Sequence, residues 1–309
     1  MTGAYRYRHY GFTLRSDIAL PHLLPGDADT PADAEIRLAP IAGDRLADAI
    51  HFRNWRAEPG ELLFHAIGIC RMLVGGGRSI IVERAPGASD AALVSIILGT
   101  GVSALLMQRR ILPMHACSIA SDTGAILVIG RSGAGKSTLL GGLLAAGCTM
   151  LADDVTGVTV GTDGIPMAIP AFPAMRLWRD SLSLLGRAAD ATVRVREDIE
   201  KYYLGVPRFR EAPMPVRAIV LLQGHNGDAI TTRPVAMANR VEAIARYVHR
   251  KNFLRALGLQ PWAFDAVVRL AQTVDMVAVG RPIANCTPAA MTDAVMDYFG
   301  LAPARQPAA

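Results

Sequence analysis

Cysteine is scarce in this sequence, and the four cysteines lie far apart. Cys70, Cys117, Cys148 and Cys286 form no C-x-x-C pair, and no histidine stands at metal-ligand spacing from them. This spacing argues against a disulfide framework and against a structural zinc site. The N-terminal residues also lack the basic and apolar segments of a secretory signal. We therefore expect a cytoplasmic protein with free thiols.

The excess of positive charge is small as well. The 309 residues include 32 Lys and Arg against 27 Asp and Glu, a net charge of +5. Nucleic-acid binding needs a clustered cationic surface, which so scattered a charge does not supply, so we expect no nucleic-acid partner. Hydrophobic residues make up 51% of the chain and charged residues 19%, which is typical of a folded protein. The length suggests about two domains.

Long hydrophobic stretches are few, and the longest one does not favour a membrane span. Residues 91–107 carry no charge, but they fall short of the roughly 20 residues that a spanning helix needs, and serine and glycine interrupt them. We interpret them as a buried helix at the end of a β-rich N-terminal domain, residues 1–110. Within that domain, short β-prone segments such as 50–55 and 79–82 alternate with turn clusters, which predicts one antiparallel sheet.

From residue 111 to residue 301 the pattern changes to alternating strands and helices, which predicts an α/β domain. The apolar segment 125–129 predicts a strand buried on both faces. A helix over 137–146 and a strand over 149–152 complete a βαβ-type unit. Further expected elements are strands at 158–160 and 218–222, a charged helix at 193–201, and helices at 240–257, 262–272 and 288–299. Residues 302–309 are expected to form a frayed tail.

One motif in this region carries chemistry. The segment Gly130-Arg131-Ser132-Gly133-Ala134-Gly135-Lys136-Ser137 matches the P-loop (Walker A) pattern G-x-x-x-x-G-K-[ST], directly after the apolar strand and at the start of a helix. The glycines let the backbone N–H groups point at phosphate oxygens. Lys136 is expected to reach the β- and γ-phosphates, and Ser137 to bind Mg²⁺. Together with Thr138, these residues form the predicted ATP site.

Two carboxylates follow at the end of the next strand. Asp153 and Asp154 come directly after the apolar residues 150–152, so we expect them to face the phosphate loop. One can hold Mg²⁺ or its waters while the other accepts the proton of an attacking hydroxyl. The adjacent like charges raise the pKa of one carboxyl, which suits a base. The alternative is a solvated Asp-Asp turn.

With these residues in place, the chain resembles a known family. His115, the loop Gly130 to Ser137 and the pair Asp153-Asp154 are similar to the catalytic domain of HPr kinase/phosphorylase, which is related in fold to phosphoenolpyruvate carboxykinases. The match covers roughly residues 113–160. It implies that Asp154 is the general base, that Asp153 is the magnesium-side carboxylate and that His115 tunes or relays the proton. Without the resemblance, His115 is as well explained as a core histidine.

The departures from the family bear on the substrate. Thr138 stands where the family usually has glutamate, and the region 169–178 lacks the glutamate of the family's L-E-x-R-G-x-G stretch. The first 110 residues do not resemble the family's N-terminal domain. These differences argue against HPr as the acceptor. The chain is similar instead to the divergent HPr-kinase-like group that includes kinases of lasso-peptide precursors, which implies a serine in a protein or peptide.

Several questions stay open at this stage. A small-molecule kinase or carboxykinase-like enzyme and an ATP-gated binding module without transfer are the alternative functions. A homo-oligomer and a peptide-docking edge of the N-terminal sheet are both compatible with the sequence. Five cations are secondary site candidates, although a solvated basic face explains any one of them more simply. These are Arg179, Arg208 and Arg210, together with Arg176 and Lys201, which we rank first.

Overall fold

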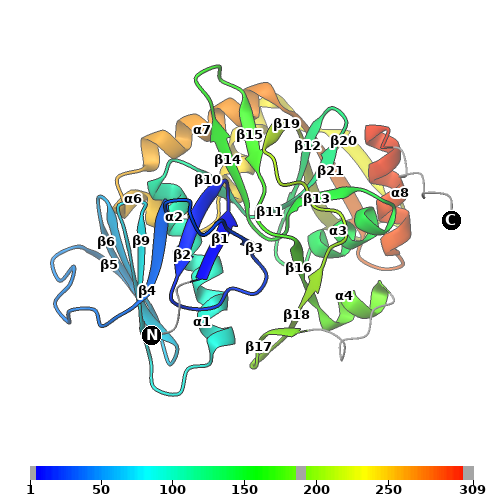
Figure 1. The fold of residues 1–309 in the computed structure, drawn as a ribbon. Coiled ribbons are helices and arrows are strands. Elements are labelled where there is room, and N and C mark those ends of the chain that lie inside the picture. Colours follow the sequence, from blue (N-terminus) through cyan, green and yellow to red (C-terminus); the bar gives the residue numbers. More distant parts are fainter. Residues whose placement is uncertain (1–4, 186–192, 302–309) are drawn as a thin grey trace.

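The computed structural model describes residues 5–185 and 193–301, so the predicted tail at 302–309 lies outside the described residues. The chain is a mixed α/β protein with two nine-stranded sheets and one three-stranded sheet. Figure 1 shows the N-terminal strands on one side of the molecule, and α3 and α8 on the other. One large cluster of buried apolar side chains includes residues of both nine-stranded sheets, for example Leu14 and Leu127.

The N-terminal sheet is mixed, so the prediction of a purely antiparallel sheet is wrong in part. Strand β4 lies between β2 and β9 and pairs with both in parallel, whereas the remaining pairs are antiparallel. A parallel pair requires a long connection, and local turn signals do not reveal it. The strands are β1 (Tyr5–His9), β2 (Phe12–Ser16), β3 (Leu24–Pro25), β4 (Ala34–Leu38), β5 (Ile50–Phe52), β6 (Trp55–Glu58), β7 (Glu61–Ala66), β8 (Cys70–Gly75) and β9 (Ser79–Arg84).

The long apolar helix follows this sheet and lies in the core. It comprises α1 (Asp90–Ile96), the π-helical turn η1 (Ile97–Gly101) and α2 (Val102–Gln108). Of the helices in the described part of the chain, this one is long and apolar enough to cross a membrane, judged by length and composition. However, 67% of its most apolar 18-residue stretch is buried inside the protein. Helix α2 contacts both β8 and β10 (Leu112–Met114). The segment thus joins the two large sheets, in agreement with the predicted core helix.

The central sheet carries the elements around the predicted phosphate loop. Its path runs β10, β14 (Thr156–Val160), β15 (Pro166–Ile169), β19 (Met214–His225), β12 (Gly124–Gly130), β11 (Ala116–Ser121) and β13 (Thr149–Ala152), and β21 (Asp275–Pro282) and β20 (Thr231–Pro234) extend it beside β19. Every residue of β12 is buried, as the apolar sequence predicts. Helix α3 (Lys136–Ala145) leads from β12 to β13, and β11 lies between these two strands.

The predicted charged helix at 193–201 is wrong. This segment belongs to β17 (Val193–Arg196) and β18 (Ile199–Gly205), which form a small antiparallel sheet with β16 (Ala174–Trp178). The alternation of valine and arginine over residues 193–196 has the period of a strand, and the charge content obscured that pattern. Helix α4 (Arg179–Leu184), which follows β16, was not predicted.

The predicted helix at 240–257 is also wrong over part of its length. Helix α5 (Met237–Arg246) ends early, and the short helix α6 (Phe253–Ala256) follows a turn. Between them, the backbone of Tyr247 and His249 bonds to the chain around β10: His115 N donates to Tyr247 O, and His249 N donates to Pro113 O, both at 2.7 Å. This long-range pairing replaces the helical bonds. Helices α7 (Gln260–Thr273) and α8 (Pro288–Phe299) agree with the prediction.

Candidate active site

The glycine-rich loop connects β12 to the N-terminus of α3. Gly133 and Gly135 have φ angles of +79° and +99°, a left-handed conformation that glycine adopts without strain. Gly130 is required for another reason, because a Cβ atom there would lie 2.7 Å from the carbonyl oxygen of Leu222 on β19. The loop therefore curls tightly at the positive end of the α3 dipole, where backbone N–H groups can bind an anion.

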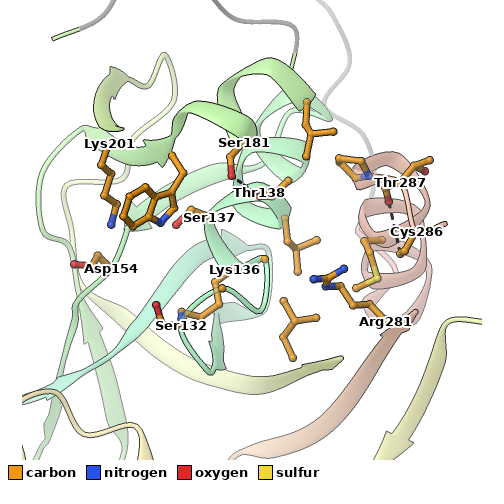
Figure 2. A pocket seen from close by; sticks show the side chains of 18 of the residues that line it. Ser132, Lys136, Ser137, Thr138, Asp154, Ser181, Lys201, Arg281, Cys286 and Thr287 are labelled. Carbon is orange, nitrogen blue, oxygen red and sulfur yellow. Dashed lines mark hydrogen bonds between the residues drawn. The ribbon is translucent and has the colours of Figure 1, made fainter. Parts of the chain in front are cut away.

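A cavity of about 230 Å³ lies in front of this loop. Ser132, Gly133, Gly135, Lys136, Ser137 and Thr138 line it. Gly130, Arg131 and Ala134 instead contribute backbone carbonyls to the loop, which accept hydrogen bonds from Lys136 and Arg281. Figure 2 shows Asp154 and Lys201 on one side of the cavity, and Arg281, Cys286 and Thr287 on the other.

Lys136 is buried beneath the loop. Its Nζ donates to Gly130 O at 2.9 Å and to Arg131 O at 3.4 Å. Burial lowers the pKa of Lys136, while the nearby Asp153 and Asp154 raise it without cancelling that effect. The ammonium is thus held at the loop by weak, replaceable carbonyl contacts, and a bound phosphate can offer it stronger, charge-assisted hydrogen bonds.

His115 connects Lys136 to the second aspartate. Its Nδ1 lies 3.0 Å from Asp154 O, and its Nε2 lies 3.2 Å from Lys136 Nζ. Lysine can only donate and a carbonyl can only accept, so these contacts assign the proton to Nδ1. Burial lowers the pKa of His115, and the opposing effect of Asp154 is smaller. The imidazole is therefore neutral and fixes the relative positions of the two residues that sequence reasoning placed at the site.

Asp153 is buried behind the cavity lining, and each of its carboxylate oxygens accepts one hydrogen bond. Its Oδ1 accepts a hydrogen bond from Ser137 Oγ at 3.1 Å, and its Oδ2 accepts one from the Arg176 backbone N–H at 2.6 Å. Burial raises the pKa of Asp153, and the charge of Asp154 adds to this effect. The sequence predicted a raised pKa for one carboxyl of the pair as a property of the base. The structure gives it to the carboxyl that bonds Ser137.

The oxygen atoms of Ser137 and Asp153 suit a hard cation. Mg²⁺ prefers oxygen ligands and is usually held by one or two protein groups together with phosphate oxygens and water. The described part of the chain contains no group of three or more His, Cys, Asp or Glu side chains that could hold a metal ion. The oxygen atoms of Ser137 and Asp153 therefore fit a magnesium ion that also has phosphate oxygens and water as ligands.

Asp154 lines the cavity and has a special backbone conformation. Its φ angle is +67°, in the left-handed region that aspartate tolerates better than most residues. One carboxylate oxygen forms an ion pair with Arg176, and the other lies 3.7 Å from His115 Nδ1. Burial raises the pKa of Asp154, but Arg176, Lys201 and His115 lower it by more, so the pKa lies well below its ordinary value. The carboxylate facing the cavity is thus ionised at neutral pH.

The secondary cations separate into two groups. Arg176 bonds Asp154, and Lys201 lines the cavity with its ammonium 5.9 Å from the centroid of the Trp178 ring. Arg179 pairs with Glu200, while Arg208 and Arg210 donate to the carbonyls of Gly147 and Ala212. Arg176 and Lys201, the two preferred candidates, thus lie at the site. The other three arginines do not line the cavity and contact the groups named above.

Arg281 is a site residue that sequence reasoning missed. It lies at the end of β21, and its Nε donates to Ala134 O at 3.0 Å across the glycine-rich loop. Strand β21 runs parallel to β19, which runs parallel to β12, so their carboxyl ends meet at one edge of the sheet. The sequence signal that could have found Arg281 is its position at the carboxyl end of an apolar strand. Ligands of parallel sheets bind at this edge, so a charged residue there is a candidate site residue. Trp178, Ser181 and Cys286, which also line the cavity, carried no such signal.

Comparison with known proteins adds little to this geometry. No family model matches the sequence, and no curated protein matches it. Among solved structures, the chain is similar to an HPr(Ser) kinase/phosphatase from Coxiella burnetii, with 12% identity and a TM-score of 0.30, over 60% of this chain and 95% of that one. A likeness this weak carries no argument. The function is therefore inferred from the site.

Proposed function

We propose that the protein is an ATP- and Mg²⁺-dependent kinase of the HPr-kinase-like type, which transfers the γ-phosphate to a serine hydroxyl of a protein or peptide. One observation supports this most strongly. One cavity combines a glycine-rich loop at a helix N-terminus with the carboxylate of Asp154, and the neighbouring Asp153, buried behind the lining, accepts a hydrogen bond from Ser137 of the same loop. Phosphoryl transfer needs these parts and little covalent chemistry from the protein.

The loop side binds and neutralises the phosphates. The N–H groups at the start of α3 and the Lys136 ammonium hold the β- and γ-phosphate oxygens, and Ser137 with Asp153 holds the metal ion. When bound, Mg²⁺ supplies charge neutralisation at the phosphates. Because these groups are held before the nucleotide arrives, little reorganisation is needed during transfer.

Asp154 receives the acceptor hydroxyl. The ion pair with Arg176 occupies one oxygen, and the other is beyond hydrogen-bond distance from His115, so it can accept a hydrogen bond from an incoming hydroxyl. With a pKa below its ordinary range, Asp154 is a weak base in the ground state. It therefore acts chiefly by positioning the hydroxyl, and takes the proton as the hydroxyl acidifies during transfer.

The ion pair also favours a second candidate, a nucleotide-gated binding module. If Arg176 holds Asp154 permanently, ATP binds and orders the cavity but is not consumed. In that case ATP binds tightly, turnover is negligible, and Asp154→Asn leaves partner binding unchanged.

Transfer of labelled γ-phosphate separates these functions. Wild-type protein, Asp154→Asn and Lys136→Ala are incubated with Mg²⁺ and labelled ATP in the presence of serine peptides, HPr, hydroxylated metabolites or cell extract. Asp228→Asn is the matched control, because Asp228 is exposed and lies outside the cavity lining. Label on a protein or peptide that requires Asp154 and Lys136 supports the serine kinase. Label on a metabolite alone indicates a small-molecule kinase. ATP binding without any transfer favours the gated module.

A further inference from the structure

A second concave surface lies on the far side of the segment that carries His249. We call it the edge groove: the space of about 1110 Å³ between β5 and β6 on one wall and the helices α5, α6 and α7 on the other. The connection from α5 to α6 links the groove to the active site. Val248 and Lys251 line the groove, while the His249 ring lies 5.9 Å from the His115 ring.

The walls of the edge groove expose large apolar side chains. Ile50 and Phe52 on β5 are 54% and 49% exposed, and Phe264 on α7 is 60% exposed. The floor contains buried apolar residues, among them Trp55, whose ring packs edge-on against Phe253 of α6 at 5.3 Å. Exposed aromatic walls above an apolar floor are typical of a binding groove.

One wall of the edge groove is an unpaired sheet edge. Within residues 5–185 and 193–301, strand β5 is the last strand of the N-terminal sheet and pairs with β6 alone. Alternate backbone N–H and C=O groups of an edge strand point away from its partner, so they are available to a further strand. An extended peptide that adds to β5 can therefore form backbone hydrogen bonds while its side chains enter the groove.

The charge around the edge groove specifies the partner. Lys251 and Arg255 are exposed on its rim, and Arg53 and Arg56 line a hollow that adjoins it at the β5–β6 turn. Among the described residues that line the groove, Glu242 is the one acidic side chain, and it is paired with Arg246 at 2.7 Å. A second copy of this chain would bring like charges together, whereas an acidic segment is attracted.

From these observations we infer that the edge groove docks an extended, acidic segment of the acceptor polypeptide, with apolar side chains entering the groove and the backbone adding to β5. The docking segment is distinct from the phosphorylated serine. Its role in substrate selection rests on the proposed function, but docking itself requires no transfer and is measured separately.

Direct binding tests the inference. The probe is a short fluorescein-labelled peptide in which glutamate alternates with valine, and its control replaces glutamate with lysine. Fluorescence anisotropy is expected to show binding of the acidic peptide, weakened by salt because the cationic rim is exposed. Phe52→Asp and the double variant Lys251→Glu, Arg255→Glu should each weaken binding by about tenfold or more. Ile67→Asp and Arg37→Glu are the matched controls, since both residues are exposed and lie outside the groove.

Backbone pairing is tested with two further probes. Each is the acidic peptide with every second backbone nitrogen methylated. In one probe the methyl groups replace the N–H hydrogens along one edge of the extended peptide, and in the other probe those along the opposite edge. Only one edge of the bound peptide faces β5 and donates its N–H groups to that strand. The probe that is methylated along this edge should therefore lose binding, whereas the other probe should retain it.

Three results would overturn the inference: equal binding of the acidic and lysine peptides, wild-type affinity in the groove variants, or unchanged binding of both methylated probes. Dimerisation that Phe52→Asp abolishes would also overturn it, in favour of a second copy. Thermal unfolding of each variant confirms that it is folded. If docking is observed but no label is transferred, the proposed kinase fails and the docking stands.

Discussion

The cavity at the glycine-rich loop and the edge groove are built from opposite kinds of surface. In the cavity, charged groups are buried and held by named partners, as Asp153 is by Ser137 and the Arg176 backbone. In the edge groove, the charges of Lys251 and Arg255 are exposed and the walls are apolar. Buried, fixed charges suit transition-state stabilisation, whereas exposed charges beside apolar walls suit recognition. Changes in the two regions should therefore affect different kinetic constants.

The largest effect is expected from Asp154→Asn. Loss of the carboxylate removes the group that positions and deprotonates the acceptor hydroxyl, so kcat should fall by about 10²- to 10⁴-fold. Affinity for ATP should change little, because Ser137, Lys136 and the loop remain. The measurement is steady-state phosphotransfer together with equilibrium ATP binding. A variant that retains wild-type kcat would remove Asp154 from the mechanism.

Arg176→Met should have a smaller effect, visible in the pH profile. Without the guanidinium, the pKa of Asp154 rises toward or above its ordinary value, because burial alone raises it. Activity of the variant should therefore decline at a higher pH than wild-type activity when the solution is acidified. Arg37→Met serves as the control for loss of an exposed arginine. If the activities of Arg176→Met and wild type fall over the same pH range on acidification, the ion pair does not set the protonation of Asp154.

Phe52→Asp should separate the groove from the cavity. With an acidic protein or peptide acceptor, the variant should raise KM by about tenfold and leave kcat unchanged, because it removes binding that is equal in ground and transition states. With a minimal acceptor that lacks the acidic segment, wild type and variant should behave alike. A fall in kcat at unchanged KM would mean that the two regions are not independent.

The smallest effect concerns the two neighbouring aspartates and stability. Asp154 has a folded-state pKa below 3.8, so its ionised form adds stability that is lost as the pH falls through that folded value. Asp153 has a folded-state pKa above 3.8, so its ionisation costs stability as the pH rises through that higher value. The Tm difference between wild type and Asp154→Asn should therefore shrink below pH 3.8.

For Asp153→Asn the pH dependence should have the opposite sign. Relative to this variant, wild type should lose Tm as the pH rises through the folded pKa of Asp153. Thermal unfolding followed by circular dichroism across this range measures both differences. The same pH dependence in both variants would contradict the distinct environments of the two carboxyls.

Local sequence was sufficient for the parts of the site whose conformation is set locally. The loop needs φ above zero at Gly133 and Gly135, and glycine at these positions predicts it. The position of Asp153 and Asp154 follows from the end of an apolar strand. By contrast, the pairing of Arg176 with Asp154 joins strand β16 of the small sheet to the bend after β13, and Arg281 reaches the loop from β21. No local pattern encodes these contacts.

The two helices that were predicted wrongly show the same limit. Residues 193–196 alternate with a period of two, but the charge content suggested a helix, and pairing with β18 decided the conformation. At 247–249, the bonds to Pro113 and His115 replaced helical ones. In both places a backbone partner distant in sequence outweighed the local preference.

The sequence by itself determined the apolar strand, the glycine-rich loop, the start of α3 and the carboxylate pair, because backbone geometry and hydrophobic period over a few residues are sufficient for each. The tertiary structure alone decided that Arg176 lowers the pKa of Asp154, that burial lowers the pKa of His115 and that Arg281 crosses the loop. It also decided that no described strand covers the outer edge of β5 beside α6 and α7. Each of these depends on burial and on charges that long-range packing brings together, which raise or lower a pKa or expose an edge independently of sequence neighbours.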